Sequence, residues 1–300
     1  MADEKWVIHP GETRTIDVDG VRRLKVGLIG GQVDIIGHDE PHARIEVHGV
    51  TIKDLRVELD GDELEIDHPQ LRWDNFLEVF RNFGAGGPRA EISVAVPRAV
   101  ALTLGVVSAG ALVAGLERTA RINTVSGDVL VDGLRGDLGV NAVSGDVQAR
   151  EMTGAFSANT VSGDVAVSGA LTRVDVDSVS GSTFVDAHGP VERISAKGVS
   201  GTVTLRLDAG YPANYVARSA SGRIRVDGVA YTSSGPATYT ASVGELSSRF
   251  VDVRVNTVAG DITVVRRESD ENAPAADGQA DAADGQTQWP GQATTEGEGL

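Results

Sequence analysis

The sequence predicts an all-β fold, a parallel β-solenoid in which short strands stack coil upon coil. Three observations support this class. The tripeptide Val-Ser-Gly recurs at a constant interval, in copies that begin at Val125, Val143, Val161 and Val179. Between copies, β-branched residues stand two apart, as Val129 and Val131 do, which is the period of a strand. The composition is 41% hydrophobic but only 4% aromatic, with 37 glycines, so short aliphatic strands and many turns are expected.

Residues 1–70 are expected to continue or cap the solenoid as a β-strand region. Short apolar segments alternate there with turn residues. The segment 55–59 is separated from 64–66 by Asp60-Gly61-Asp62, which is a hairpin signal.

Residues 71–89 are expected to form a short amphipathic helix and a glycine-rich loop. Four of the chain's 13 aromatic residues fall in 71–83. They form a candidate interaction face of Trp73, Phe76, Phe80 and Phe83. Two roles stay open for this face: it covers an open end of the solenoid, or it docks a partner protein or a membrane.

Residues 90–266 hold the solenoid repeats, in 18-residue coils. A weaker repeat at half this interval indicates at least two turns in each coil. Stacked coils bring equal positions into register about 4.8 Å apart, so the repeated polar residues are expected to form turn ladders. Glycine supplies the positive φ of the corner, and the next aspartate accepts hydrogen bonds from turn amides. The ladder residues are Asn123, Asn141, Asn159, Ser126, Ser144, Ser162, Gly127, Gly145, Gly163, Asp128, Asp146 and Asp164.

The apolar positions of the repeats define an expected interior. We expect a right-handed path, with the number of sides open. Val258-Ala259-Gly260 is the last copy of the tripeptide along the chain. The residues expected to point inward are Val125, Val129, Val131, Leu134, Leu138, Val140, Val143, Val147, Met152, Phe156, Val161, Val165 and Val167.

The charge is acidic and uneven. The chain has 43 acidic and 27 basic residues, a formal net charge of −16, which disfavours nucleic acid as a partner. Residues 267–300 are expected to be a disordered acidic tail, because from Glu268 onward they lack periodicity and carry acids without Lys or Arg beyond Arg267.

No cofactor or metal is expected. Asp128, Asp146 and Asp164 invite comparison with calcium-binding β-rolls, but each coil offers one Gly-Asp rather than the fuller glycine-aspartate pattern, so turn capping is favoured. The pair His38 and His42 flanks Pro41, which prevents a helix that would place both on one face.

A carbohydrate-active lyase or hydrolase is the alternative from another class, because such enzymes also use β-helices. Their catalytic carboxylates converge in a groove. Residues 107–190 show almost no insertions that would build one. Only the irregular stretch 207–248 offers aromatic residues for a sugar, namely Tyr211, Tyr215, Tyr231 and Tyr239.

The run Ile92 to Pro97, ISVAVP, followed by serial V-S-G-D-V copies, resembles the bacterial DUF4097 family of adhesin-like β-helical proteins. The similarity covers roughly residues 5–266. It implies a surface or envelope-associated display fold without an established reaction, and some relatives are linked to envelope-stress sensing.

We therefore expect a non-enzymatic adhesin-like scaffold whose partner is an unidentified protein or cell-envelope component. The N-terminus shows no signal-peptide pattern and no run approaches about 18 uncharged apolar residues. These features predict no transmembrane segment and a cytoplasmic location for the chain as written, with a cell-surface or envelope location as the alternative. The oligomeric state stays open.

Overall fold

The structure, a computed structural model, describes residues 4–69, 87–231, 235–245 and 250–267, and within these ranges it contains strands and no helix. The N-terminal strands are β1 (Glu4–Ile8), β2 (Arg14–Asp19), β3 (Arg23–His38), β4 (His42–Thr51), β5 (Leu55–Asp60), β6 (Glu63–Asp67) and β7 (Arg89–Pro97). The central strands are β8 (Ala101–Ala114), β9 (Ala120–Ser126), β10 (Val129–Asp132), β11 (Leu138–Ser144), β12 (Val147–Ser162), β13 (Val165–Ser180), β14 (Thr183–Ala187), β15 (Arg193–Ser200) and β16 (Val203–Asp208). The C-terminal strands are β17 (Ala213–Ser219), β18 (Ile224–Val226), β19 (Val229–Tyr231), β20 (Ala237–Val243), β21 (Val251–Ala259) and β22 (Ile262–Arg267).

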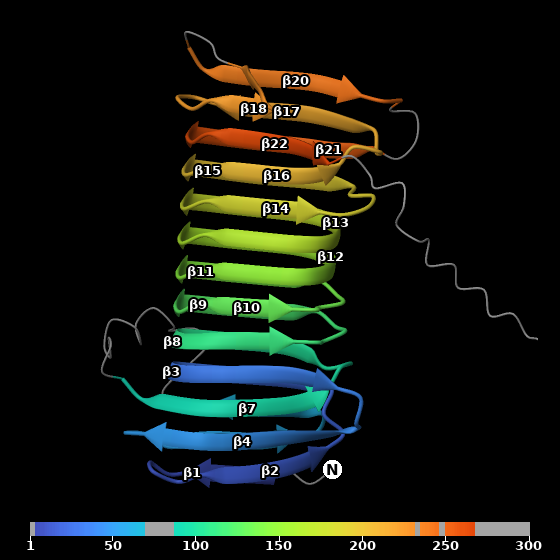
Figure 1. The fold of residues 1–300 in the computed structure, drawn as a ribbon. Coiled ribbons are helices and arrows are strands. Elements are labelled where there is room, and N and C mark those ends of the chain that lie inside the picture. The colour runs from blue at the N-terminus through green and yellow to red at the C-terminus, as the bar shows by residue number, and fades with distance from the viewer. Residues whose placement is uncertain (1–3, 70–86, 232–234, 246–249, 268–300) are drawn as a thin grey trace, which may run out of the picture. The chain divides into compact units, whose positions relative to one another are not determined.

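The central strands form a stack of parallel coils (Figure 1). Val129 of β10 lies beside Ala111 of β8 on one side and Val147 of β12 on the other, each one repeat away along the chain. Such register arises because one 18-residue turn of the chain returns to the same position one strand higher. The predicted β-solenoid with 18-residue coils is thus confirmed.

Both ends of the stack are built differently from its middle. β3 pairs in parallel with β8 and continues the stack, while β4 pairs with β7 in the antiparallel sense. At the other end, β20 pairs antiparallel with β17. Antiparallel strands therefore close the parallel stack at each end.

The order of the last coils in space differs from their order in sequence. β21 pairs in parallel with β15 on one side and with β17 on the other, so the final repeat lies inside the stack. The last copy of the repeat along the chain, Val258-Ala259-Gly260, is therefore not in the last coil of the stack. Along the chain β17 to β20 come first, and β21 then fills the space between β15 and β17, where it pairs with a strand on each side.

The interior follows strand alternation. Ten of the expected inward residues are buried in the hydrophobic core: Val129, Val131, Leu134, Leu138, Val140, Val147, Met152, Phe156, Val165 and Val167. Val125 is buried as well, but it lies outside that core. Val143 and Val161 are not buried, with 39% and 50% of their surfaces exposed. Val140 and Ala142 both point inward. Because side chains of a strand alternate between its two faces, Val143 points outward.

Two expectations fall outside the described residues. These are the aromatic segment with Trp73, Phe76, Phe80 and Phe83, and the acidic tail from Glu268 onward. None of the described segments forms a helix long and apolar enough to cross a membrane.

His68, directly after β6, predicts a pH-dependent stability. Its side chain is fully buried, its Nδ1 accepts a hydrogen bond from Ile29 N at 3.4 Å, and its Nε2 has no partner among the described residues. Burial lowers the pKa of His68 from 6.5 to about 4. Between these two values the unfolded chain binds a proton that the folded chain does not, so stability is lost as pH falls through this window.

We expect His68 to contribute a loss of roughly 3 kcal/mol in the free energy of unfolding between pH 7 and pH 4, since each pKa unit corresponds to about 1.4 kcal/mol. Denaturant titrations of the wild type and of His68→Leu at both pH values measure this loss. The variant should lose less stability on acidification. Equal losses in both proteins would show that His68 is not the group responsible.

Candidate binding groove along the stacked coils

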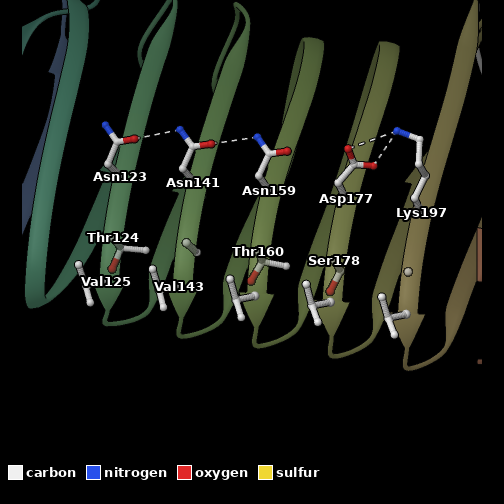
Figure 2. A pocket seen from close by; sticks show the side chains of 15 residues that line it. Asn123, Thr124, Val125, Asn141, Val143, Asn159, Thr160, Asp177, Ser178 and Lys197 are labelled. Atoms are coloured by element: carbon white, nitrogen blue, oxygen red, sulfur yellow. Dashed lines mark hydrogen bonds and ion pairs between the residues drawn. The ribbon is translucent and has the colours of Figure 1, made fainter. Parts of the chain in front are cut away.

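A groove of about 720 Å³ crosses five neighbouring coils (Figure 2). Three consecutive residues near the end of a strand in each coil line it, on β9, β11, β12, β13 and β15. In chain order they are residues 123–125, 141–143, 159–161, 177–179 and 197–199. Parallel pairing in register places equal positions of the coils side by side, so each side of the groove is a row of equivalent side chains.

One side of the groove is a ladder of amides. Asn141 Nδ2 donates to Asn123 Oδ1 at 2.9 Å, and Asn159 Nδ2 donates to Asn141 Oδ1 at 2.9 Å. A side-chain amide has two N–H donors and two acceptor lone pairs, and the ladder uses one donor and one lone pair of Asn141. The row therefore retains hydrogen-bonding capacity at a regular spacing.

The same row ends in an ion pair. Asp177 follows Asn159 in register, and Lys197 Nζ donates to its two carboxylate oxygens at 3.1 Å and 3.3 Å. The two charges cancel, so the groove carries no net charge in a chain whose formal charge is −16.

The opposite side is a row of exposed valines. Their exposed fractions are 39% for Val143, 50% for Val161, 48% for Val179 and 48% for Val199, whereas Val125 at one end is buried. An isolated exposed valine needs no explanation, but a continuous apolar row is typical of a contact surface.

On the floor of the groove, the side-chain hydroxyls donate hydrogen bonds to backbone carbonyls of the adjacent turns. Thr124 Oγ1 donates to Gly127 O at 3.3 Å, Thr160 Oγ1 to Ser162 O at 3.2 Å, and Ser178 Oγ to Ser180 O at 3.4 Å. These side chains are also buried, so the floor offers little free hydrogen-bonding capacity. The groove thus combines one apolar side and one amide side over such a floor.

The serine ladder is formed with backbone rather than with other serines. Ser144 Oγ donates to Val125 O at 3.0 Å and Ser162 Oγ to Val143 O at 3.2 Å. Ser126 makes the same contact with Val107 O at 3.3 Å. Each hydroxyl therefore ties its coil to the previous one beneath the valine row.

The Gly-Asp corners next to the groove also join neighbouring coils. Gly127, Gly145 and Gly163 have φ angles of 143°, 106° and 112°, the conformation expected at the corner. The aspartates that follow accept from backbone amides of the next coil: Asp128 from Asp146 N at 3.0 Å, Asp146 from Asp164 N at 2.9 Å, and Asp164 from Ser182 N at 2.7 Å. These contacts are the turn capping predicted for the column.

The other titratable clusters lie outside the groove. His38 and His42 have ring centroids 5.7 Å apart, and His38 Nδ1 accepts from Glu40 N at 3.0 Å within the same turn. Among the described residues, no group of three or more His, Asp or Glu side chains could hold a metal ion.

Three of the four tyrosines of the irregular stretch come together at the C-terminal end. Ring centroids are 6.5 Å apart for Tyr215 and Tyr239 and 4.7 Å apart for Tyr231 and Tyr239. Burial raises the pKa of Tyr215 and of Tyr239. Among the described residues, no ring contact joins Tyr211 to these three tyrosines, and the side chain of Tyr211 is exposed.

Sequence reasoning missed two parts of the groove. The valine row was assigned to the interior, although the strand period between Val140 and Val143 would have placed Val143 outside. Lys197 was not recognised as a member of the asparagine column, because the interval from Asp177 to Lys197 is longer than the repeat that precedes it.

Residues 113–192, which include most of the groove, match a family model described as Toastrack DUF4097. This stretch of the chain is similar to the DUF4097 family. The resemblance inferred from the V-S-G-D-V repeats is therefore confirmed over residues 113–192, a shorter span than the expected 5–266, and these coils, called the DUF4097 coils below, carry all of the groove except residues 197–199. No curated protein matches this chain.

Several solved structures are similar to the chain. A candidate cell adhesion protein from Clostridium sporogenes is 14% identical, covers 89% of this chain and 99% of its own, and has a TM-score of 0.32. A candidate adhesin from Bacteroides fragilis is 14% identical, with 85% and 97% covered and a TM-score of 0.45. A candidate lipid-binding protein from Parabacteroides distasonis is 12% identical, with 85% and 96% covered and a TM-score of 0.37. Because these sequence identities and TM-scores are low, nothing about a ligand of the DUF4097 coils is inferred from these structures.

Proposed function

We propose that the protein is a non-enzymatic, adhesin-like scaffold that binds an elongated component of the cell envelope in the groove of its DUF4097 coils. The observation that carries the proposal is a row of three amides facing a row of five valines, held in register across neighbouring coils. A repeated surface suits a ligand that is itself extended and repetitive. Each coil then contributes a weak contact, and the contacts add along the groove.

The chemistry of the groove favours binding over catalysis. Among the described residues that line it, only Asp177 and Lys197 are ionisable, and they pair with each other. Hydrolysis of a polysaccharide uses two carboxyl groups on either side of the scissile bond. Asparagine amides and valine methyls supply recognition without a general acid, a general base or a nucleophile.

Co-sedimentation of the full chain with purified envelopes from the native cells tests the proposal. In the double variant Val161→Lys with Val179→Lys, two charges enter the apolar row, and we expect the apparent Kd to rise at least about 10-fold, which corresponds to about 1.4 kcal/mol. Both valines are about half exposed, so the fold should tolerate the change. The control is Ala170→Lys, which adds a charge at an exposed position that does not line the groove.

The outcomes separate the parts of the proposal. The proposal is supported if the wild type and the control sediment with the envelopes while the groove variant stays in solution. Equal sedimentation of all three proteins would exclude the groove as the binding surface, and a wild type that never sediments would exclude an envelope ligand. Protease treatment of intact native cells then reports whether the protein is accessible from outside, as the envelope proposal requires.

A further inference from the structure

The C-terminal end of the solenoid presents an edge strand without charge. β20 has the sequence ATYTASV, with no charged residue and no proline. Among the described residues it pairs with β17 alone, and it is the outermost ribbon at that end of the stack (Figure 1). Natural sheets usually protect such edges with charges, prolines or bulges, because an unpaired edge recruits other strands.

The N-terminal end carries that protection. The edge strand β2 displays Arg14, Asp17 and Asp19, and Asp17 accepts from Arg44 Nε at 2.8 Å. Its inward residues Ile16 and Val18 are only 5% exposed. One end of the stack is therefore both charged and closed over its interior.

Beneath β20 the interior is less well covered. Tyr239 and Val243 point toward the core but stay partly buried. In the neighbouring strand β17, the inward residues Tyr215 and Ala217 are 3% exposed, because strands cover them on both sides. A further strand beside β20 would extend the core in the same way.

The charge of this end also differs from that of the chain. Residues 210–245, which include β17 to β20, contain three arginines against two acidic residues, whereas the whole chain has a net charge of −16. The electrostatic repulsion that opposes association of acidic chains is therefore weakest at the end that carries β20.

We propose that β20 pairs in the antiparallel sense with β20 of a second copy of this chain. The strand is complementary to itself: with Thr240 at the centre, Thr240 lies opposite the partner's Thr240, and Thr238 lies opposite the partner's Ser242. Tyr239 then lies opposite the partner's Ala241. Hydroxyl pairs and an aromatic beside a small residue are favourable cross-strand neighbours, and no like charges face each other. The resulting dimer has two-fold symmetry and displays two grooves.

Light scattering coupled to size exclusion, run over a range of concentrations, tests the dimer. The full chain should show twice its 31.2 kDa mass. Thr240→Lys and Thr240→Glu, each at an exposed position, should each give the single-chain mass, because like charges then face each other across the two-fold axis. An equimolar mixture of the two variants should regain the double mass, because Lys then faces Glu.

The control places the same charges on the other edge strand. Thr15→Lys and Thr15→Glu, at an exposed position of β2, should leave the double mass unchanged. A wild type of single-chain mass at all concentrations, a dimer that persists in Thr240→Lys, or a loss of the dimer in the Thr15 variants would overturn the proposal. Monomeric Thr240 variants that do not recover on mixing would overturn the two-fold register, and circular dichroism melts check that each variant is folded.

Discussion

Gly145→Val is expected to destabilise the solenoid by about 4 kcal/mol or more. Gly145 has a φ of 106°, and a Cβ added there would lie 2.5 Å from Gly127 O and 2.8 Å from Gly127 C of the preceding coil. A β-branched residue in this backbone region costs about 1 to 3 kcal/mol, and forced overpacking costs a further 1 to 3 kcal/mol or so. The obstacle is backbone, so no side chain can turn aside to relieve it.

The matched control is Gly139→Val in the same coil. Nothing lies within 4 Å of a Cβ at Gly139, and its φ is not positive. Valine is favourable in a strand, so this variant should keep the stability of the wild type or exceed it slightly. Guanidinium unfolding followed by circular dichroism measures both variants. Equal midpoints for Gly145→Val and the wild type would mean that the corner is not as tight as the structure shows.

The repeating part of the fold could be predicted because equal positions of consecutive repeats become neighbours when the coils stack. The asparagine column recurs once in each of three successive coils, at Asn123, Asn141 and Asn159, and stacking at the strand spacing turns such a recurrence directly into contact. The same logic predicted the Gly-Asp corners. Register is strongly determined here, since a slip of one residue would expose the buried face of every coil.

The ends could not be predicted in the same way, because they depend on contacts between segments that do not repeat. Nothing in the Val258-Ala259-Gly260 copy indicates that β21 lies between β15 and β17. Any coil of this fold offers the same two edges, so the order of the last coils is decided by which hairpin can close the stack. The antiparallel pair of β17 and β20 takes that role.

The groove shows the same division between what repeats and what does not. Its amide row was predicted, but its function as one side of a groove depends on the exposure of the valines opposite, which Val-Ser-Gly alone does not reveal. Strand alternation decides the exposure of the valines: Ala142, Thr160 and Ser178 hold the inward position before the corner, and the valine that follows each of them points outward.

Removal of the returning strands is expected to have the second large effect. A chain truncated after Arg249 lacks β21 and β22, which separate the coil of β15 and β16 from that of β17 and β18. Five buried aliphatic side chains leave the core with them: Val251, Val253, Val255, Ile262 and Val264. At about 1.5 to 3 kcal/mol for each buried side chain, the loss approaches roughly 10 kcal/mol, comparable to the total stability of a typical domain.

The truncation also removes the ion pairs that hold β22 to earlier coils. Arg267 Nη2 lies 2.7 Å from Asp208 Oδ1, and its Nη1 contacts Asp186. A chain that ends after Arg267 keeps all of these contacts and is the matched control, and we expect its melting temperature to equal that of the full chain. The shorter chain should melt far lower and without a single cooperative transition, since β17 to β20 lose their parallel partners. Similar melting curves for the two truncated chains would contradict the placement of β21 between β15 and β17.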